Sequence, residues 1–353
     1  MFMPNIIPDK VGFSTLDWEK IRRTEILHLF EQNVYGVTPT SIPDCDYEIY
    51  KDKIIGNAVK RDVYVRFSSD GKTCGFSFSI YMPMEITEPL PAVIMINCFS
   101  KNNEALSHKR AYEYLPYDII TENKCIGIIA NVDEFCIDDS EEYRKGILEQ
   151  LPSQGKSGWG AIGAWAWGAS RVMDYALLCK EIDSSRVAVC GCSRAGKAAL
   201  WCGAQDTRFA LTISLVSGCT GAALTRGKTG EHIRDITGKF PHWMCNKYAE
   251  FSDRENELPI DQHMLLSLCA PRLLYVSSAS EDSWADPRKE FESCILAGSI
   301  YELYGARGLS STEFPEAGSA IHGGSIGYHL RKGPHGCYIF DWKQYLKYIH
   351  LHL

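Results

Sequence analysis

GCSRAGK, residues 191–197, is the stretch of sequence that decides the fold. Residues 186–191 (RVAVCG) are apolar like a short buried strand, and residues 197–203 (KAALWCG) favour a helix. A tight turn between such a strand and helix exposes the hydroxyl of Ser193, and the next backbone N–H then faces an oxyanion that forms on a substrate carbonyl. The stretch therefore predicts a nucleophilic serine, although an ordinary turn built from small residues fits it as well.

The glycines around this serine match the nucleophile motif G-x-S-x-G of α/β-hydrolases only in part. Gly191 stands two residues before Ser193, but Ala195 occupies the second glycine position and Gly196 follows one residue late. Alanine is small enough for the turn, so the motif is weakened rather than lost. A literal copy at residues 323–327 (GGSIG) lacks a preceding apolar strand and a following helix, which favours a loop that enters a late strand.

An acid and a histidine must follow the serine in chain order, each just after a strand, if Ser193 belongs to the triad of this fold. Residues 272–278 (RLLYVSS) are strand-like and lead into the acidic turn SEDSWADP. Residues 326–331 lead into Gly-Pro-His-Gly, which presents His335 before a final amphipathic helix. The sequence predicts Asp282 as the acid and His335 as the general base, and the chemistry needs no metal or organic cofactor.

Simpler interpretations of these residues stay open. Acidic residues after a strand are often solvated turn formers, and Asp286 before Pro287 suits the N-terminal cap of a helix. His335 competes with nine other histidines, of which His263 and His329 have the surroundings of packed or hydrogen-bonded structural residues.

Longer stretches of the chain resemble one known family, in family order. The signature Gly-Cys-Ser-Arg-x-Gly-Lys is similar to that of the glucuronoyl esterases, carbohydrate esterase family 15. The resemblance covers most of residues 150–345 through the segments GWGAIGAWAWGASRVMDYAL, SGCTGAALTRGKTGE, FPHWM, LPIDQHMLLSLCAPRLLYV, EDSWADP and GYHLRKGPHG, and residues 18–36 add an N-terminal match. It implies an α/β-hydrolase three-layer sandwich, with a mostly parallel central sheet that has an antiparallel start, and a serine triad.

The resemblance also implies roles for individual residues. Ser193 corresponds to the nucleophile, His335 to the general base, and Arg194 to the arginine that joins backbone amides in stabilising the oxyanion. The residues that correspond to the family's contacts with the uronic acid ring are Lys197, Glu231 and Trp284. A lysine and a glutamate can bind vicinal hydroxyls, and an indole can lie against the apolar face of a sugar. A solvated lysine, a charge at a helix N-terminus and a core aromatic are the simpler alternatives for these three.

One position departs from the family pattern. Many members place the triad glutamate immediately before a Ser-Gly pair, where this chain has Val216. Valine cannot orient an imidazolium, so the acid is expected at the alternative family position after the later strand, where Asp282 stands two residues before Trp284. Glu281 is its nearest rival, and the choice between these two carboxylates stays open.

The chain of 353 residues is expected to form a single catalytic domain over residues 1–353, with residues 1–45 as an N-terminal segment wrapped onto it. Residues 92–97 and 125–131 are apolar throughout, as parallel strands covered on both faces are. Residues 97–100 (NCFS) are candidates for a second oxyanion N–H group. The segments that alternate enough for an antiparallel start to the sheet are residues 47–55, 62–67 and 74–82.

Net charge and hydropathy limit the classes of partner and the cellular location that the sequence supports. The net charge of -7 argues against nucleic acid or an anionic membrane as a partner. No apolar run approaches the ~18 residues of a membrane span, and the opening MFMPNIIPDK lacks the features of a signal peptide. The sequence as it stands predicts a cytoplasmic protein, or a secreted one if a leader has been removed.

The 14 cysteines favour buried free thiols over a disulfide framework. Several of them fall inside predicted core elements, and no C-x-x-C pair indicates a zinc site. The cysteines expected in core strands and helices are Cys125, Cys179, Cys190 and Cys202.

These observations together predict a serine esterase that cleaves esters of glucuronic acid, of the kind that link xylan side chains to lignin alcohols, or oligosaccharide esters derived from them. A carbohydrate uronic acid ester is the expected partner. Two alternatives are an acetyl- or feruloyl-xylan esterase, in which the sugar lies on the alcohol side, and a catalytically silent carbohydrate-binding homologue. The sequence carries no signal for the preferred alcohol, the oligosaccharide length or the oligomeric state.

Overall fold

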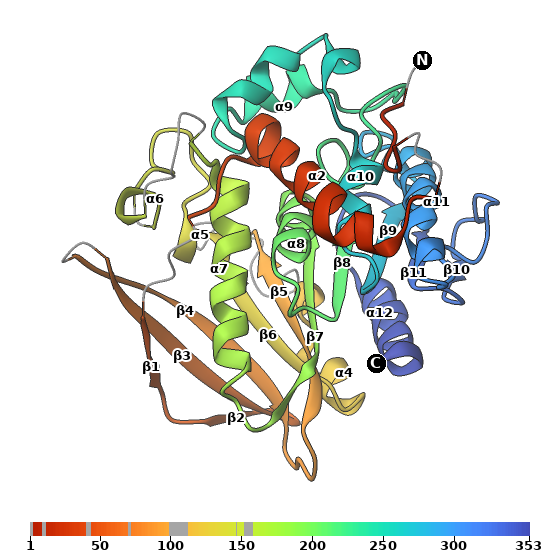
Figure 1. Cartoon of the computed structure of the whole chain (residues 1–353). Coiled ribbons are helices and arrows are strands. Elements are labelled where there is room, and N and C mark those ends of the chain that lie inside the picture. The colour runs from red at the N-terminus through yellow and green to blue at the C-terminus, as the bar shows by residue number, and fades with distance from the viewer. Residues whose placement is uncertain are drawn as a thin grey trace.

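A computed structural model describes residues 3–8, 12–39, 44–69, 72–98, 112–145, 147–151 and 158–353. Within these residues, 11 strands form one sheet in the order β1-β3-β4-β6-β5-β7-β8-β9-β11-β10, and β2 pairs with β3 (Figure 1). The strands are β1 (Cys45–Ile49), β2 (Lys53–Ile55), β3 (Ala58–Ser69), β4 (Lys72–Pro83), β5 (Leu90–Asn97), β6 (Ile126–Asn131), β7 (Ile182–Cys192), β8 (Leu211–Leu215), β9 (Leu273–Ala279), β10 (Ala320–Ile321) and β11 (Ile326–Arg331).

The sheet is parallel from β6 through β5, β7, β8 and β9 to β11, and antiparallel at both edges. This confirms the mostly parallel sheet with an antiparallel start. The α-helices of the described residues are α1 (Thr15–Asp17), α2 (Arg23–Phe30), α4 (Tyr117–Glu122), α5 (Val132–Phe135), α6 (Ile147–Gln150), α7 (Ala161–Ala176), α8 (Arg194–Gln205), α9 (Ile233–Lys239), α10 (Gln262–Ser267), α11 (Pro287–Leu303) and α12 (Ile339–His352). Further helical turns are η1 (Trp18–Arg22), η2 (Glu31–Tyr35), η4 (Asn246–Phe251) and η5 (Glu255–Glu257).

The side chains of β5 alternate between two cores, because successive residues of a strand point to opposite faces of the sheet. Ala92, Ile94 and Ile96 belong to the core that also contains residues of α7 and α8. Val93 and Met95 belong to the second core, with residues of α4 and α12. Figure 1 shows α7 and α8 lying across one face of the sheet. Helices therefore cover both faces, which gives the three layers of an α/β-hydrolase.

The N-terminal residues pack onto α8, the helix that follows Ser193. Tyr35 stacks on Trp201 of α8 with ring centroids 4.6 Å apart, and its hydroxyl donates to the carbonyl of Thr220 at 2.6 Å. Arg23 of α2 donates to the carbonyl of Ala204 at the end of α8. Figure 1 shows the red N-terminal helices crossing close to α8. The segment boundary expected at residue 45 stays a prediction.

One expected strand differs from the structure in detail. Residues 47–55 form two strands instead of one, because the pairing with β3 slips by one residue between Ile49↔Val63 and Lys53↔Lys60. Residues 50–52 (YKD) contain no glycine or proline, so the sequence carries no strong signal for this break. Phe99 and Ser100, part of the candidate second oxyanion segment, lie outside the described residues. The GGSIG sequence leads into the start of β11, as expected for a loop entering a late strand.

The four cysteines expected in core strands and helices, Cys125, Cys179, Cys190 and Cys202, are buried free thiols. Cys190 lies in β7 and Cys202 in α8, whereas Cys125 comes just before β6 and Cys179 shortly after α7. Among the helices in the described ranges, none combines the length and apolar character that crossing a bilayer requires.

Candidate active site

The residues that the sequence singles out follow neighbouring parallel strands. Ser193 comes after β7, Val216 after β8, Asp282 after β9 and His335 after β11. The carboxyl ends of parallel strands meet at one edge of the sheet, where α/β proteins bind their ligands. A cavity of about 610 Å³ opens at this edge, and its lining includes all seven predicted site residues: Ser193, Arg194, Lys197, Glu231, Asp282, Trp284 and His335.

Ser193 has a backbone conformation that residues with a side chain rarely adopt, with φ 59° and ψ −124°. Its N–H donates to the carbonyl of Leu215 at 2.8 Å, and its own carbonyl accepts from Gly196 at 2.9 Å. These bonds to β8 and to the first turn of α8 hold the strained geometry, which carries an energy of order 1–3 kcal/mol. Such strain is a feature of functional turns.

Close packing explains the displaced glycine of the motif. A Cβ atom on Gly191 would lie 2.1 Å from the carbonyl oxygen of Ala195, so only glycine fits there. A Cβ on Gly196 would lie 3.0 Å from the Cβ of Ser217, in the loop that follows β8. The glycine that arrives one residue late is therefore the one pressed against this loop.

The loops after β9 and β11 stay hydrogen-bonded to each other beyond the ends of the strands. The N–H of Ser280 donates to the carbonyl of Arg331 at 2.8 Å, and the N–H of Glu281 to the carbonyl of Gly333 at 3.1 Å. This pairing brings His335 to Asp282, and Nδ1 of the imidazole lies 2.6 Å from Oδ2 of the carboxylate. The Asp282 side chain is 5% exposed and the His335 side chain 48%, so a buried carboxylate holds an accessible imidazole.

The other two acids of this turn have different partners. Glu281 is exposed, and its backbone pairs with the loop that carries His335. Asp286 caps α11 by accepting from the N–H of Lys289 at 3.2 Å, and it also accepts from the N–H of Thr229 at 2.9 Å. Of the three carboxylates, Asp282 is the one that contacts the imidazole.

Arg194 is held by groups that sequence analysis did not identify. Its guanidinium forms an ion pair with Asp138 and lies 4.7 Å from the ring centroid of Trp243 and 5.2 Å from that of Phe240. The two rings stack on each other with centroids 3.8 Å apart. Cation–π contacts of this kind stabilise a guanidinium in a fixed place.

Asp138 is itself fixed by two further donors. Its Oδ1 accepts from Nε1 of Trp243 at 2.7 Å and lies 2.9 Å from Nε2 of His242. Burial opposes ionisation of this carboxyl, but the hydrogen bonds and the charge of Arg194 hold its pKa below the usual value. Asp138 lies 56 residues before Arg194 in the chain, and no local pattern marks it. The family segment FPHWM contains Phe240, His242 and Trp243, and it was the one sequence feature that pointed to this cluster.

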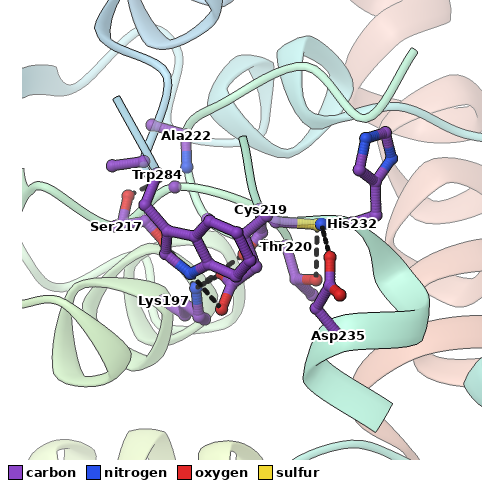
Figure 2. Close-up of polar contacts among 12 residues, drawn as sticks. Lys197, Ser217, Cys219, Thr220, Ala222, His232, Asp235 and Trp284 are labelled. Carbon is purple, nitrogen blue, oxygen red and sulfur yellow. Dashed lines mark hydrogen bonds and ion pairs between the residues drawn. The ribbon is translucent and has the colours of Figure 1, made fainter. Parts of the chain in front are cut away.

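The three predicted sugar contacts form a connected set. The buried ammonium of Lys197 donates to the carbonyls of Ser217 at 2.5 Å and Cys219 at 2.6 Å, and it lies 3.7 Å from Oε2 of Glu231. Nε1 of Trp284 donates to Oε1 of the same glutamate at 3.2 Å. Figure 2 shows Lys197 reaching toward Ser217 and Cys219 with Trp284 beside it.

Lys197 and Trp284 differ in how far they are buried. Desolvation lowers the pKa of Lys197, and the charge of Glu231 opposes that shift. Trp284 is 55% exposed, so its indole offers an open face at the cavity. Neither the solvated lysine nor the core aromatic considered from sequence describes these side chains.

A buried glutamate, Glu290 of α11, is hydrogen-bonded to the loop after β8. Oε1 accepts from the N–H of Gly218 at 2.9 Å, and Oε2 accepts from the hydroxyl of Ser278 at 2.5 Å. Burial raises its pKa to about 7, and the nearby charge of Asp282 adds to this rise. In the sequence, Glu290 has the appearance of an ordinary charged residue of an amphipathic helix, and no local pattern marks it as buried.

A doubly covered parallel sheet, a strained serine between strand and helix, and a carboxylate-bound histidine at the same edge define an α/β-hydrolase. The model of the family described as "Glucuronyl esterase, fungi" matches residues 65–305. Carbohydrate esterase MZ0003, from an unknown prokaryotic organism, is 35% identical over 96% of this chain and 86% of its own length. The chain belongs to the glucuronoyl esterase family, carbohydrate esterase family 15.

Solved structures share the fold over the whole chain. The glucuronoyl esterase from Solibacter usitatus superposes with a TM-score of 0.91 at 33% identity, over 100% of this chain and 98% of that one. A serine-to-alanine mutant of the Sporotrichum thermophile enzyme, in complex with methyl 4-O-methyl-β-D-glucopyranuronate, superposes with a TM-score of 0.72 at 25% identity, over 99% of this chain and 87% of that one.

Replacing Gly191 by alanine tests the packing of the serine turn. The new methyl group would meet the carbonyl of Ala195, so we expect the free energy of unfolding to fall by roughly 1–3 kcal/mol in urea titrations. Gly238→Ala is the matched control, because nothing lies within 4 Å of its Cβ position in α9. That control should be neutral or stabilising by about 0.4–1 kcal/mol. Equal losses in the two variants would contradict the packing argument.

Replacing Glu290 by glutamine tests its buried carboxyl through the pH dependence of stability. Folding raises the pKa of Glu290 from 4.5 to about 7, so the unfolded chain ionises first and the fold loses stability as the pH rises through this window. The amide does not ionise. Between pH 5 and pH 8 the wild type should therefore lose roughly 2–3 kcal/mol more of its unfolding free energy than Glu290→Gln.

Urea unfolding at the two pH values measures this difference. Glu292→Gln, on the same helix but outside the buried pocket, is the control and should keep the wild-type pH dependence. If Glu290→Gln also kept it, the carboxyl would not be the group that titrates.

Proposed function

We propose that this protein is a serine esterase that hydrolyses 4-O-methyl-glucuronoyl esters of xylan with lignin-type alcohols, or oligosaccharide esters derived from them. The observation that carries the proposal is one cavity of about 610 Å³ that contains both Ser193 with the His335–Asp282 pair and the Lys197–Glu231–Trp284 set. The complex of a family member with methyl 4-O-methyl-β-D-glucopyranuronate supports the same substrate class.

The reaction begins at the serine. His335 accepts the proton of the Ser193 hydroxyl through Nε2, while Nδ1–H donates to Asp282 and keeps the imidazole in the required tautomer. The serine oxygen attacks the uronoyl carbonyl and forms a tetrahedral oxyanion. His335 then gives the proton to the departing alcohol, which leaves an acyl-enzyme. Water repeats the sequence, so the products are the free uronic acid and the regenerated serine.

Two kinds of donor on Arg194, its backbone N–H and its guanidinium, can stabilise the oxyanion. Arg194 is the first residue of α8, and the backbone N–H of a first helical residue has no acceptor within its own helix. Its guanidinium carries five N–H donors, and the ion pair with Asp138 orients them without using them all. Donors fixed before the reaction stabilise the transition state without reorganisation.

The sugar is recognised on the acyl side of the ester. Two of the three donors of Lys197 bind the carbonyls of Ser217 and Cys219, which directs the remaining one toward Glu231 and the sugar hydroxyls. The exposed indole of Trp284, oriented by Glu231, suits the apolar face of the pyranose. An acetyl esterase has no use for such a set on this side, which disfavours that alternative.

The acid of the triad is tested by two neighbouring substitutions. Asp282→Asn should lower kcat for benzyl glucuronate by about 10²- to 10⁴-fold, because the amide no longer fixes the tautomer and charge of His335. Glu281→Gln is the control and should stay near the wild-type rate, since Glu281 is exposed. A larger loss in Glu281→Gln than in Asp282→Asn would reassign the acid.

The substrate class is tested by selectivity. The wild type should hydrolyse benzyl glucuronate with a higher kcat/KM than methyl galacturonate or acetylated xylan. Glu231→Gln should lower kcat/KM for benzyl glucuronate by about 10- to 150-fold, the equivalent of one charged hydrogen bond, and leave p-nitrophenyl acetate nearly unaffected.

Glu255→Gln is the matched control for this experiment, because Glu255 pairs with His232 close to α9 but does not line the cavity. An unchanged ratio of the two activities in Glu231→Gln, or a wild type that prefers acetylated xylan, would leave the serine mechanism standing and overturn the uronate assignment.

A further inference from the structure

Arg331 lies directly beneath the loop that carries His335. It is the last residue of β11 and is 5% exposed. Its guanidinium donates to three carbonyls of this loop, those of Lys332 at 3.1 Å, Pro334 at 2.8 Å and Gly336 at 3.0 Å. Two of these carbonyls belong to the residues immediately before and after His335. One planar group therefore binds the backbone on both sides of the histidine.

The glycines of the loop turn these carbonyls inward. Gly333 has a φ of 113° and Gly336 a φ of 140°, values in the region that favours glycine. A Cβ on Gly333 would lie 3.2 Å from Nη1 of Arg331, and the guanidinium carbon lies 4.2 Å from the ring centroid of Tyr338. The loop is thus wrapped closely around the guanidinium.

A buried carboxylate anchors the arginine from the other side. Nε of Arg331 donates to both oxygens of Asp341 at 3.1 Å, and Asp341 is fully buried in the first turn of α12. The same carboxylate accepts from the N–H of Tyr338 at 2.8 Å and contacts Nε2 of His329 at 2.8 Å. The anchor therefore ties the loop to β11 and to α12 together.

His335 has little support of its own. Its side chain is 48% exposed, and the hydrogen bond to Asp282 fixes only one ring nitrogen. The distance between the other nitrogen and Ser193 therefore depends on where the backbone of residues 334–336 lies. A misplacement of about 1 Å at a reacting group can lower a rate 10²-fold.

We propose that Arg331, anchored by Asp341, is a positioning residue that places the imidazole of His335 between Asp282 and Ser193. This inference rests on the proposed function in that it takes His335 as the general base. Lysine cannot replace it, because a single ammonium cannot reach a carboxylate and three carbonyls at once.

The test compares Arg331→Lys with Arg272→Lys. Arg272 also binds backbone carbonyls, those of Asp206, Phe209, Gly203 and Leu268, but it lies just before β9, at the opposite end of the strand from Asp282. We measure kcat and KM for benzyl glucuronate, the rate at which a fluorophosphonate modifies Ser193, and the thermal midpoint of each variant. Arg331→Lys should lose about 10²-fold in kcat and in the fluorophosphonate rate with an unchanged KM. Arg272→Lys should keep both rates.

Wild-type rates in a folded Arg331→Lys, or an equal loss of rate in Arg272→Lys, would overturn the proposal. If Arg331→Lys does not fold, Asp341→Asn decides, because it keeps all three carbonyl contacts of the guanidinium. That variant should lose roughly 10-fold in kcat at constant KM, and a wild-type kcat would overturn the proposal.

The fluorophosphonate reaction needs the serine and the histidine but no uronic acid. A wild type that reacts with this probe and fails to hydrolyse benzyl glucuronate would therefore refute the substrate assignment and leave the positioning role of Arg331 measurable. A probe that reacts equally with Ser193→Ala would refute the serine mechanism itself.

Discussion

The parallel pairing of β11 with β9 is the constraint on which the site depends. Arg331 pairs with Ala279 at the end of the two strands. The loops that follow β9 and β11 remain hydrogen-bonded to each other and bring His335 into contact with Asp282. A slip of two residues would carry the histidine about 6.6 Å along the strand and separate the pair. The register is in turn fixed by burial on both faces of the sheet, so the same apolar packing that forms the core also sets the geometry of the acid and the base.

Three cations near the reacting centre are each paired with a carboxylate within the protein. Arg194 faces Asp138, Lys197 faces Glu231, and Arg331 faces Asp341. A buried charge without a partner is strongly destabilising, whereas a paired one is tolerated and has a defined direction. The pairs therefore contribute more to the placement of donors than to the stability of the fold. Two of the three carboxylates, Asp138 and Asp341, serve residues whose position matters for the chemistry.

Local sequence patterns predicted that Ser193, Asp282 and His335 each follow a strand, and in the structure they come after β7, β9 and β11. The three-layer architecture was expected from the family resemblance. Local patterns could not choose between Asp282 and Glu281, since both precede the same turn and only the register of β9 with β11 separates them. The roles of Asp138 and Glu290 could not be predicted from the sequence for a different reason. Each acts on a residue far away in the chain, and a single charged residue in a loop or helix has the same appearance whether it is buried or solvated. The break between β1 and β2 was missed because residues 50–52 contain no glycine or proline to mark it.

Val216 has a consequence for the loop that follows β8. The carboxylate that contacts His335 stands after β9, and the loop after β8 has Val216 at the alternative position. This loop is held on both sides, by Lys197 at the carbonyls of Ser217 and Cys219 and by Glu290 at the N–H of Gly218. A loop that the protein's own hydrogen bonds already restrain loses less conformational entropy when a sugar binds against it. With valine at residue 216, the contribution of this segment is therefore its shape, which hydrogen bonds within the protein set before any ligand binds.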